Sequence, residues 1–337
     1  MVVMPRESAK IVSAYAKNVF IDDEAIKAVA CKLLEELKEK RIDINNFSQC
    51  KFHPKCSDPK AIDWIFLLDL LNFSFWTEEN ANKWKVNGQT GYFAMCAAIK
   101  RAIDEGTPIT DPKYYSKITK NELEVIFRGD DNTINIPLIN ERVKVLHEAG
   151  EVLLNKYKGT FVECIKSCAG SAEKLLKLIV TDFHSFQDEA QFQTYKISFY
   201  KRAQILIGDI WACFKGKEYG EFYDIDFLTM FADYRIPQVL VHFGTLKYSS
   251  SLLNKLCSGF KLESGSVEEI EIRGCSIEVV ERINNEVKHL INSHNNLRLK
   301  ESDINCVLID HFLWDYRRQY AKELDSIPFH KTRCIYY

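Results

Sequence analysis

The sequence predicts a mostly α-helical protein, and two observations carry that prediction. Apolar residues recur at three- and four-residue spacing along much of the 337-residue chain, as on the buried face of a helix. Only two short segments are typical of β structure, and no glycine-rich phosphate loop indicates an α/β nucleotide-binding fold. We therefore expect helices joined by loops, with small β elements.

The elements follow in chain order. Asp22 and Asp23 cap a helix that runs to about Lys40, with apolar residues along one face. The pair Asn87-Gly88 favours the positive φ angles of a tight hairpin over 84–92, and 123–136 is expected to be a second β element. The whole chain, 1–337, is expected to be one domain, and one arrangement would be two helical lobes with the active-site cleft between them. Further helices are expected over 63–76, 139–157, 161–183, 194–214, 277–293 and 303–324.

Composition limits the function classes. A net charge of −2 supplies no cationic field for a polyanion, so no stable nucleic-acid complex is expected. No signal peptide opens the sequence, and the longest apolar run, 64–76, is shorter than the about 20 residues that span a membrane. Eleven scattered cysteines without framework spacing indicate reduced thiols, so we expect a cytoplasmic protein without a membrane partner.

A cysteine-rich loop is the strongest hint of a metal. Cys50, His53 and Cys56 offer three soft ligands within seven residues, but a fourth ligand for tetrahedral zinc is not visible nearby. Paired C-x2-C sets, which would make a zinc prediction strong, are absent. We therefore favour a loop with incidental cysteines and expect no metal and no other cofactor.

Two segments near the C-terminal end place carboxylates among aromatic residues. These are 231–238, with Asp233, and 308–316, with Asp310 and Asp315. An ionised carboxylate in apolar surroundings is costly unless it has a partner or a task. Carboxylates beside flat rings suit a cationic or electron-poor ring and a reaction that develops positive charge, such as cleavage of a glycosidic bond.

Each carboxylate also has a purely structural interpretation. Asp310 and Asp315 lie about 140° apart around a helix and could pair with nearby basic side chains instead of flanking a pocket. Asp233 precedes Pro237, which fits the first turn of a helix, so Asp233 could cap that helix or pair with Arg235. The pattern alone leaves these alternatives open.

Several ordered motifs together resemble the queuosine salvage family, the queuosine 5′-phosphate N-glycosylase/hydrolases. The resemblance spans nearly the whole chain and includes the two carboxylate segments. Its motifs are Pro5-Arg-Glu-Ser-Ala-Lys10, His53-Pro54, Ala61-Ile-Asp-Trp64, Leu71-Asn-Phe-Ser-Phe-Trp76, Gly91-Tyr-Phe-Ala94, Phe231-Ala-Asp-Tyr-Arg-Ile-Pro-Gln238, Glu271-Ile-Arg-Gly-Cys275, Leu313-Trp-Asp-Tyr316, Pro328-Phe-His330 and Arg333-Cys-Ile-Tyr-Tyr337.

The resemblance implies a helical fold similar to helix-hairpin-helix DNA glycosylases. It also implies hydrolysis of queuosine 5′-monophosphate to queuine and ribose 5-phosphate, without a metal or organic cofactor. The Leu-Pro-Gly-Val-Gly hairpin that grips DNA phosphate in those glycosylases is missing, and 236–244 stands where one would look for it. That departure favours a mononucleotide substrate over a polymer.

The resemblance also suggests roles for individual residues. Asp233 is the expected catalytic carboxylate, which stabilises the developing ribosyl cation or activates water. Asp310 and Asp315 are expected to bind the guanine-like edge of the base or the ammonium and diol of queuine. The other expected substrate-binding residues are Phe231 and Trp314 as stacking surfaces, His53 as a pocket residue, and Arg235, Lys247 and Arg273 as cations for the 5′-phosphate.

Two other functions remain open at this point. The chain could be a glycosylase for another modified nucleoside or for nucleic acid, or it could bind queuine as a carrier without cleaving a nucleotide. A carrier would keep the stacking and acidic residues but would release no base, whereas a nucleic-acid enzyme would bind oligonucleotides with a steep salt dependence.

Overall fold

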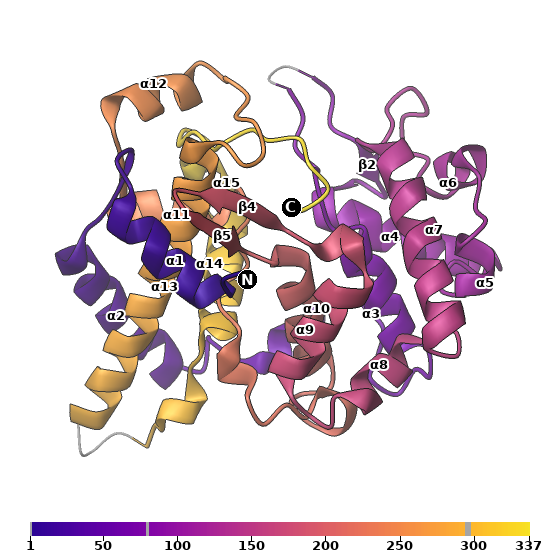
Figure 1. The fold of residues 1–337 in the computed structure, drawn as a ribbon, viewed down its shortest axis with the longest axis horizontal. Coiled ribbons are helices and arrows are strands. Elements are labelled where there is room, and N and C mark those ends of the chain that lie inside the picture. The colour runs from indigo at the N-terminus through magenta and orange to yellow at the C-terminus, as the bar shows by residue number, and fades with distance from the viewer. Residues whose placement is uncertain (1, 79–80, 294–297) are drawn as a thin grey trace. The chain divides into compact units, whose positions relative to one another are not determined.

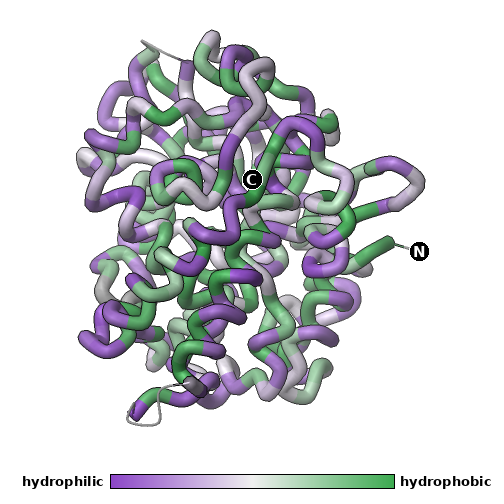
Figure 2. Tube along the Cα trace, turned by 90° about the vertical axis from the view of Figure 1, so that its left-hand side faces the viewer, coloured by the Kyte–Doolittle hydropathy of each residue, from purple (hydrophilic) through white to green (hydrophobic). Residues whose placement is uncertain are grey.

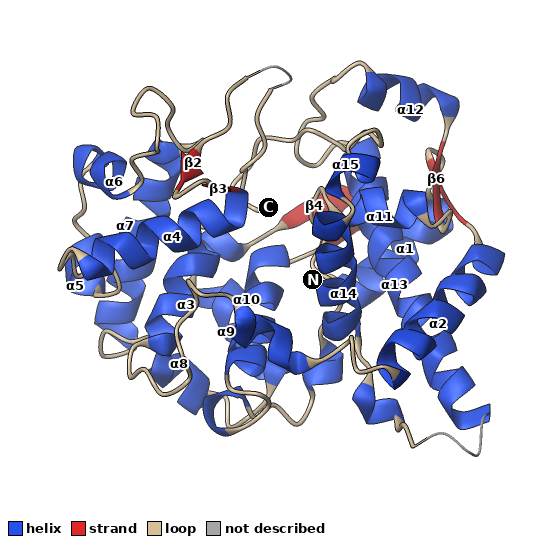
Figure 3. Cartoon of the chain, turned by 180° about the vertical axis from the view of Figure 1, so that it is seen from behind, coloured by secondary structure: helices blue, strands red, loops and turns tan. Residues whose placement is uncertain are grey.

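The computed structural model describes residues 2–78, 81–293 and 298–337, and helices dominate these residues (Figure 3). The β structure in this described part consists of short two-stranded antiparallel ribbons. The prediction of a mostly α protein with small β elements is therefore confirmed. The chain divides into two compact units of discontinuous sequence: unit 1 contains Met1–Ile44, Asp188–Lys201 and Asp226–Arg333, and unit 2 contains Asn45–Gln187, Arg202–Ile225 and Cys334–Tyr337.

Unit 1 is organised around the long helix α13 (Val267–Ser293), which is buried over most of its length. Helices α1 (Pro5–Tyr15) and α2 (Asp23–Lys38) pack against it, as the indigo and orange ribbons of Figure 1 show. Asp22 caps α2 by accepting a hydrogen bond from Ala25, as expected. Unit 1 also contains β1 (Val19–Ile21), β4 (Glu189–Phe192), β5 (Tyr195–Ser198), α11 (Ile236–His242), β6 (Leu246–Tyr248), α12 (Ser250–Cys257), the 3-10 helix η5 (Glu301–Asp303), α14 (Cys306–Gln319) and α15 (Ala321–Leu324).

A glycine sets the closest approach between α1 and α13. A Cβ atom added to Gly274 would lie 2.5 Å from the nearest methyl carbon of Val12, which is far inside van der Waals contact. Only a residue without a side chain lets the two helices approach this closely. The packing of the first segment of unit 1 onto α13 therefore depends on Gly274.

Unit 2 surrounds the apolar helix α3 (Ala61–Leu70), nearly all of whose residues are buried. The predicted hairpin is confirmed as β2 (Lys85–Val86) and β3 (Gln89–Thr90), with Asn87 and Gly88 at φ of 51° and 72°. The α-helices of unit 2 besides α3 are α4 (Gly91–Asp104), α5 (Pro112–Tyr115), α6 (Lys120–Ile126), α7 (Ile139–Lys156), α8 (Phe161–Ser167), α9 (Ala172–Asp182) and α10 (Lys201–Cys213), whose first residue belongs to unit 1. Its 3-10 helices are η1 (Ile44–Gln49), whose first residue belongs to unit 1, η2 (His184–Phe186), η3 (Glu218–Gly220) and the first residue of η4 (Ile225–Phe227).

Two buried arginines terminate α3. Arg142 donates to the carbonyl oxygens of Leu71 and Phe73, and Arg202 donates to that of Leu70. The guanidinium groups thus bind carbonyls that a helix end leaves without partners, and both lie over the ring of Phe73. The helix ends at Leu70, so the predicted extension to residue 76 is wrong.

Three other element predictions are wrong as well. Residues 123–126 of the second expected β element belong to α6 (Lys120–Ile126), because Thr119 and Glu122 make a capping box that starts a helix there. In 194–214 the first residues form β5, which a turn at Gln193, with φ of 53°, connects to β4. The helix expected over 161–183 is divided at Gly170, whose φ is 75°, and Ser171 caps the second part.

Apolar and polar segments are interspersed along most of the tube in Figure 2. Within residues 2–78, 81–293 and 298–337, no helix has the length and apolar character needed to cross a membrane.

The close contact at Gly274 yields a prediction about stability. Alanine is the better helix former, by about 1 kcal/mol, yet Gly274→Ala should destabilise the protein by about 1–3 kcal/mol because its methyl group meets Val12. The matched control is Asn285→Ala at an exposed position of the same helix, which should keep or slightly raise stability. Urea unfolding of both variants tests this, and a Gly274→Ala protein as stable as wild type would contradict it.

Candidate active site

Asp310 lies in the buried part of α14 and is 5% exposed. Asn305 caps this helix by accepting a hydrogen bond from Leu308, so the helix begins just before Asp310 and turns its side chain inward. Oδ1 of Asp310 accepts a hydrogen bond of 2.9 Å from the backbone N–H of Phe231. The two carboxylate segments identified in the sequence therefore meet at this bond within unit 1.

The surroundings of Asp310 favour its protonated form. Burial raises its pKa well above the usual value, and the negative charge of Asp233 raises it further. The Phe231 N–H and the positive charge of Lys201 oppose this shift. Lys201 is buried at the first turn of α10, and nothing in the sequence pattern singled it out. The site thus combines two interacting carboxyl groups and one ammonium group.

Asp233 occupies the turn before α11. Its Oδ1 accepts hydrogen bonds from the backbone N–H groups of Arg235 (2.8 Å) and Ile236 (2.9 Å), which agrees with a role for Asp233 at the helix entry, although the N-cap residue of α11 is Arg235. Pro237 lies in the first turn of α11, as predicted. Oδ2 of Asp233 accepts no hydrogen bond from the described residues. One oxygen therefore anchors the carboxylate and the other is available to a ligand.

Trp314 and Asp315 follow Asp310 on α14. Asp315 is 46% exposed at its side chain and lies 4.0 Å from Arg318, whose guanidinium group covers the Trp314 ring at 4.9 Å. Partial burial raises the pKa of Asp315, and Arg318 opposes this. Asp310 and Asp315 thus differ in exposure, as their angular separation predicted, and the alternative pairing of Asp315 with an arginine is present at long range.

His311 is a second residue that the sequence reasoning missed. Its ring lies 6.2 Å from that of Phe231, and burial lowers its pKa to about 4, so the imidazole is neutral at physiological pH. It precedes Trp314 and Asp315 by three and four residues, which places all three on one face of α14. This three- and four-residue spacing is the sequence signal that could have identified His311 as a neighbour of Trp314 and Asp315.

The three cations predicted for phosphate lie in different settings. Arg235 donates from Nη1 to Gln238 and stacks on Phe329 at 4.5 Å, while its Nε and Nη2 have no hydrogen-bond partner among the described residues. Lys247 is exposed on β6 and pairs with Asp22 at 2.6 Å. Arg273 is 2% exposed on α13 and its guanidinium group is hydrogen-bonded within unit 1.

His53 belongs to unit 2. Its Nδ1 lies 2.9 Å from the carbonyl oxygen of Phe47, and its Nε2 lies 3.1 Å from the hydroxyl of Tyr92. Burial lowers its pKa to about 4, so this imidazole is also neutral. Among the described residues, no group of three or more histidine, cysteine, aspartate or glutamate side chains could hold a metal ion.

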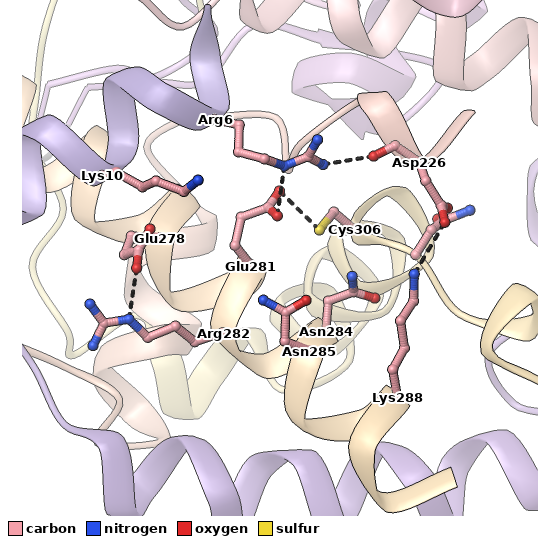
Figure 4. Close-up of a pocket in the computed structure, with 11 residues that line it drawn as sticks. Arg6, Lys10, Asp226, Glu278, Glu281, Arg282, Asn284, Asn285, Lys288 and Cys306 are labelled. Carbon is pink, nitrogen blue, oxygen red and sulfur yellow. Dashed lines mark hydrogen bonds and ion pairs between the residues drawn. The ribbon is translucent and has the colours of Figure 1, made fainter. Parts of the chain in front are cut away.

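Unit 1 also contains a polar pocket of about 300 Å³ between α1, α13 and the start of α14 (Figure 4). Two of its carboxylates form ion pairs: Glu281 with Arg6 at 2.8 Å, and Asp226 with Lys288 at 3.1 Å. Cys306 donates to the other oxygen of Glu281. None of the site residues predicted from the sequence lines this pocket.

Comparison with known proteins finds similarity over nearly the whole chain. The family model described as queuosine salvage protein matches residues 52–337. A Bos taurus protein named queuosine 5′-phosphate N-glycosylase/hydrolase is 45% identical over 99% of this chain and 98% of its own length. Proteins of the same name from Mus musculus and Sphaerobacter thermophilus are 44% and 33% identical, over 99% and 96% of this chain and 98% and 94% of theirs. Because the family model matches residues 52–337 and these relatives are similar over nearly the whole chain, the chain belongs to the queuosine salvage protein family.

Proposed function

We propose that this protein hydrolyses the N-glycosidic bond of queuosine 5′-phosphate and releases queuine for salvage into tRNA. The observation that carries this proposal is the near full-length similarity to relatives that bear the name of this activity. In the reaction the oxygen of water joins C1′ of the ribose, the bond from C1′ to the base breaks, and the base leaves with a proton. The products are queuine and ribose 5-phosphate.

The chemistry of the leaving base defines the task. A 7-deazaguanine base lacks N7, the usual site at which protonation helps a purine to leave. The enzyme must therefore stabilise the ribosyl cation and supply a hydrogen-bond donor elsewhere on the base. Two carboxyl groups in different protonation states can perform these two tasks, because one is negative while the other donates a proton.

Asp233 is the proposed catalytic carboxylate. Backbone donors hold its Oδ1, so the side chain is positioned before substrate binds. Oδ2 can face the developing positive charge at C1′ or orient the attacking water. Preorganisation of this kind removes the need to reorganise the carboxylate during the reaction.

Asp310 is the proposed hydrogen-bond donor to the base. Its raised pKa keeps a proton on the side chain, and Oδ1 already accepts from Phe231, so Oδ2 is the oxygen that can donate. Phe231 and Trp314 are proposed as stacking surfaces, and the half-exposed Asp315 is proposed to bind the ammonium of queuine. We keep His53 as a pocket residue in this proposal.

Arg235 is favoured as the cation for the 5′-phosphate, because it keeps two guanidinium nitrogens for a ligand. Lys247 remains an alternative. The contacts of Arg273 favour an indirect role, through the backbone that it holds. The proposal needs no metal or organic cofactor.

The proposal includes the predictions about domain organisation, fold relationship, location and substrate size. Residues 1–337 act as one catalytic unit, which the full-length similarity to the relatives supports. The helical architecture is proposed to be related to helix-hairpin-helix DNA glycosylases, on the basis of its helix content and of a carboxylate at a helix entry. A cytoplasmic location and a mononucleotide substrate, without a stable nucleic-acid complex, complete it.

Mass spectrometry of purified protein incubated with queuosine 5′-phosphate tests the function directly. Free queuine and ribose 5-phosphate should appear in equal amounts. Queuine binding without release of base would support a carrier instead. Preferential cleavage of a modified oligonucleotide, with steep salt dependence, would support a nucleic-acid glycosylase.

The catalytic assignment predicts the behaviour of Asp233→Asn. The amide keeps the cap, because its Oδ1 still accepts hydrogen bonds, but it removes the charge. Single-turnover hydrolysis should fall about 10²–10⁴-fold, whereas queuine affinity and the melting temperature should change little. A folded variant with near-normal hydrolysis would exclude Asp233, and Asp315 would be the next candidate.

Asp310→Asn should lower hydrolysis and raise stability. The amide still accepts from Phe231 but transfers no proton, so the rate should fall about 10²–10⁴-fold. The pKa of Asp310 is higher in the folded protein than in the unfolded chain. As pH rises from about 4 towards the folded pKa, the unfolded chain ionises while the folded protein keeps the proton, so the free energy of unfolding falls. The variant should therefore melt higher than wild type at neutral pH, and the gap should close near pH 4.

The pH–rate profile provides a further check on Asp310. Wild-type activity should decline as pH rises through the pKa of this group, and that limb should be absent in Asp310→Asn. In Asp233→Asn the limb should move to lower pH, because removal of the neighbouring negative charge lowers the pKa of Asp310. A high-pH limb unchanged in both variants would show that another group titrates.

The phosphate contact predicts a contrast between two cations. Arg235→Ala should raise KM for queuosine 5′-phosphate about 10-fold or more, the effect of losing a charge-assisted hydrogen bond of about 1.5–3 kcal/mol. Queuine affinity should stay near wild type, because queuine carries no phosphate. Lys247→Ala should change neither value. An increase in KM for Lys247→Ala alone would reassign the phosphate to β6.

A further inference from the structure

A buried ion pair of Asp188 and Arg273 is hydrogen-bonded to the backbone of the segment that carries Asp233. Asp188 is 4% exposed and Arg273 is 2% exposed. The guanidinium Nη2 donates to Asp188 Oδ2 at 2.5 Å and Nη1 donates to Asp188 Oδ1 at 2.9 Å, which is a two-point contact. Glu269, one helical turn before Arg273, accepts from Nη1 at 3.2 Å.

The remaining bonds of this pair end on the backbone of the site. Nε of Arg273 donates at 3.0 Å to the carbonyl oxygen of Ala232, the residue between Phe231 and Asp233. Oδ2 of Asp188 accepts at 3.1 Å from the backbone N–H of Lys201. One ion pair therefore touches both the peptide that carries the anionic group and the residue that carries the ammonium group.

Regular secondary structure does not fix the backbone of the segment that carries Asp233. Phe231, Ala232 and Asp233 lie in a stretch without regular secondary structure, where no helix or strand ladder determines the direction of the peptide. A guanidinium fork fixes both direction and distance, because its donors lie in one plane. The peptide at Ala232 is thus oriented by α13.

We propose that Asp188 and Arg273 are positioning residues for hydrolysis, holding the Ala232 carbonyl and the start of α10 so that Asp233 and Lys201 face the same substrate. This inference rests on the proposed function and assigns Arg273 a role away from the phosphate. The pair acts through the backbone and does not contact substrate.

Arg273→Lys is the decisive variant. It keeps the positive charge beside Asp188 and Glu269 but cannot bind Asp188 through two points and Ala232 at the same time. We expect kcat to fall about 10–100-fold with less than a threefold change in KM, because misplacing a catalytic group costs about that much in the transition state. Queuine affinity should stay within threefold of wild type.

A double variant separates positioning from general destabilisation. If Arg273 acts by positioning Asp233 and Lys201, adding Arg273→Lys to Asp233→Asn should slow hydrolysis clearly less than Arg273→Lys slows it in the wild-type background, because the charge of Asp233 is already gone. If Arg273 only supports the fold, the two losses should multiply. Multiplying losses would overturn the proposal.

Glu281→Gln is the matched control. It removes a carboxylate from another ion pair of α13, the one with Arg6 shown in Figure 4, and this pair makes no hydrogen bond to Phe231, Ala232 or Asp233. Its melting temperature should drop while kcat stays at the wild-type value. A loss of kcat in this control equal to that of Arg273→Lys would also overturn the proposal.

Asp188→Asn provides a second measurement from the other partner. It should lose kcat in the same way, and if it is recovered unfolded, Arg273→Lys and the double variant decide the question. Wild-type protein is measured in every assay as the reference. Failure of wild type to release queuine would count against the proposed function, whereas an active wild type with undiminished kcat in Arg273→Lys would overturn the positioning role alone.

Discussion

The positive charge buried at Arg273 is the constraint on which unit 1 depends. A guanidinium group out of contact with water needs acceptors on every side, and it obtains them from Asp188, Glu269 and the Ala232 carbonyl. These acceptors come from three separate parts of the chain. The charge therefore links the segment before β4, the start of α13 and the loop before α11, and displacement of any one of them would remove an acceptor from a buried guanidinium group.

Unit 2 uses arginine in a related way but with neutral acceptors. Arg142 and Arg202 bind carbonyl oxygens at the end of α3, and Phe73 contributes its ring to both. A guanidinium group suits this position because it offers several donors to carbonyls that have no intrahelical partner. Each unit thus uses a buried guanidinium to fix a non-helical stretch of backbone.

Much of this architecture could be predicted from the sequence, and the failures have physical causes. Periodicity located α2, and Asn87-Gly88 located the hairpin, because both signals are local. The ribbon of β1 and β6 joins Val19 to Tyr248 and depends on pairing that no local pattern encodes. The end of α3 was missed for the same reason, since Arg142 lies far along the chain.

The candidate site shows the same division between local and distant information. The proximity of Phe231 and Asp310 was suggested by two aromatic, acidic segments and is seen in their hydrogen bond. Lys201 and Asp188 carried no recognisable motif, because their importance comes from contacts with residues distant in sequence. Of the cations chosen for phosphate, the sequence could not distinguish the solvent-exposed Lys247 from the buried Arg273.

The discontinuous make-up of unit 1 has a consequence for biosynthesis. Its first stretch, Met1–Ile44, completes its core only when α13 appears, more than 220 residues later. At a translation rate of about 5–20 residues per second, the apolar faces of α1 and α2 wait on the order of ten to forty-five seconds for their partner. During that interval the nascent chain presents two unsatisfied amphipathic helices, which makes it a natural client for chaperones that act at the ribosome.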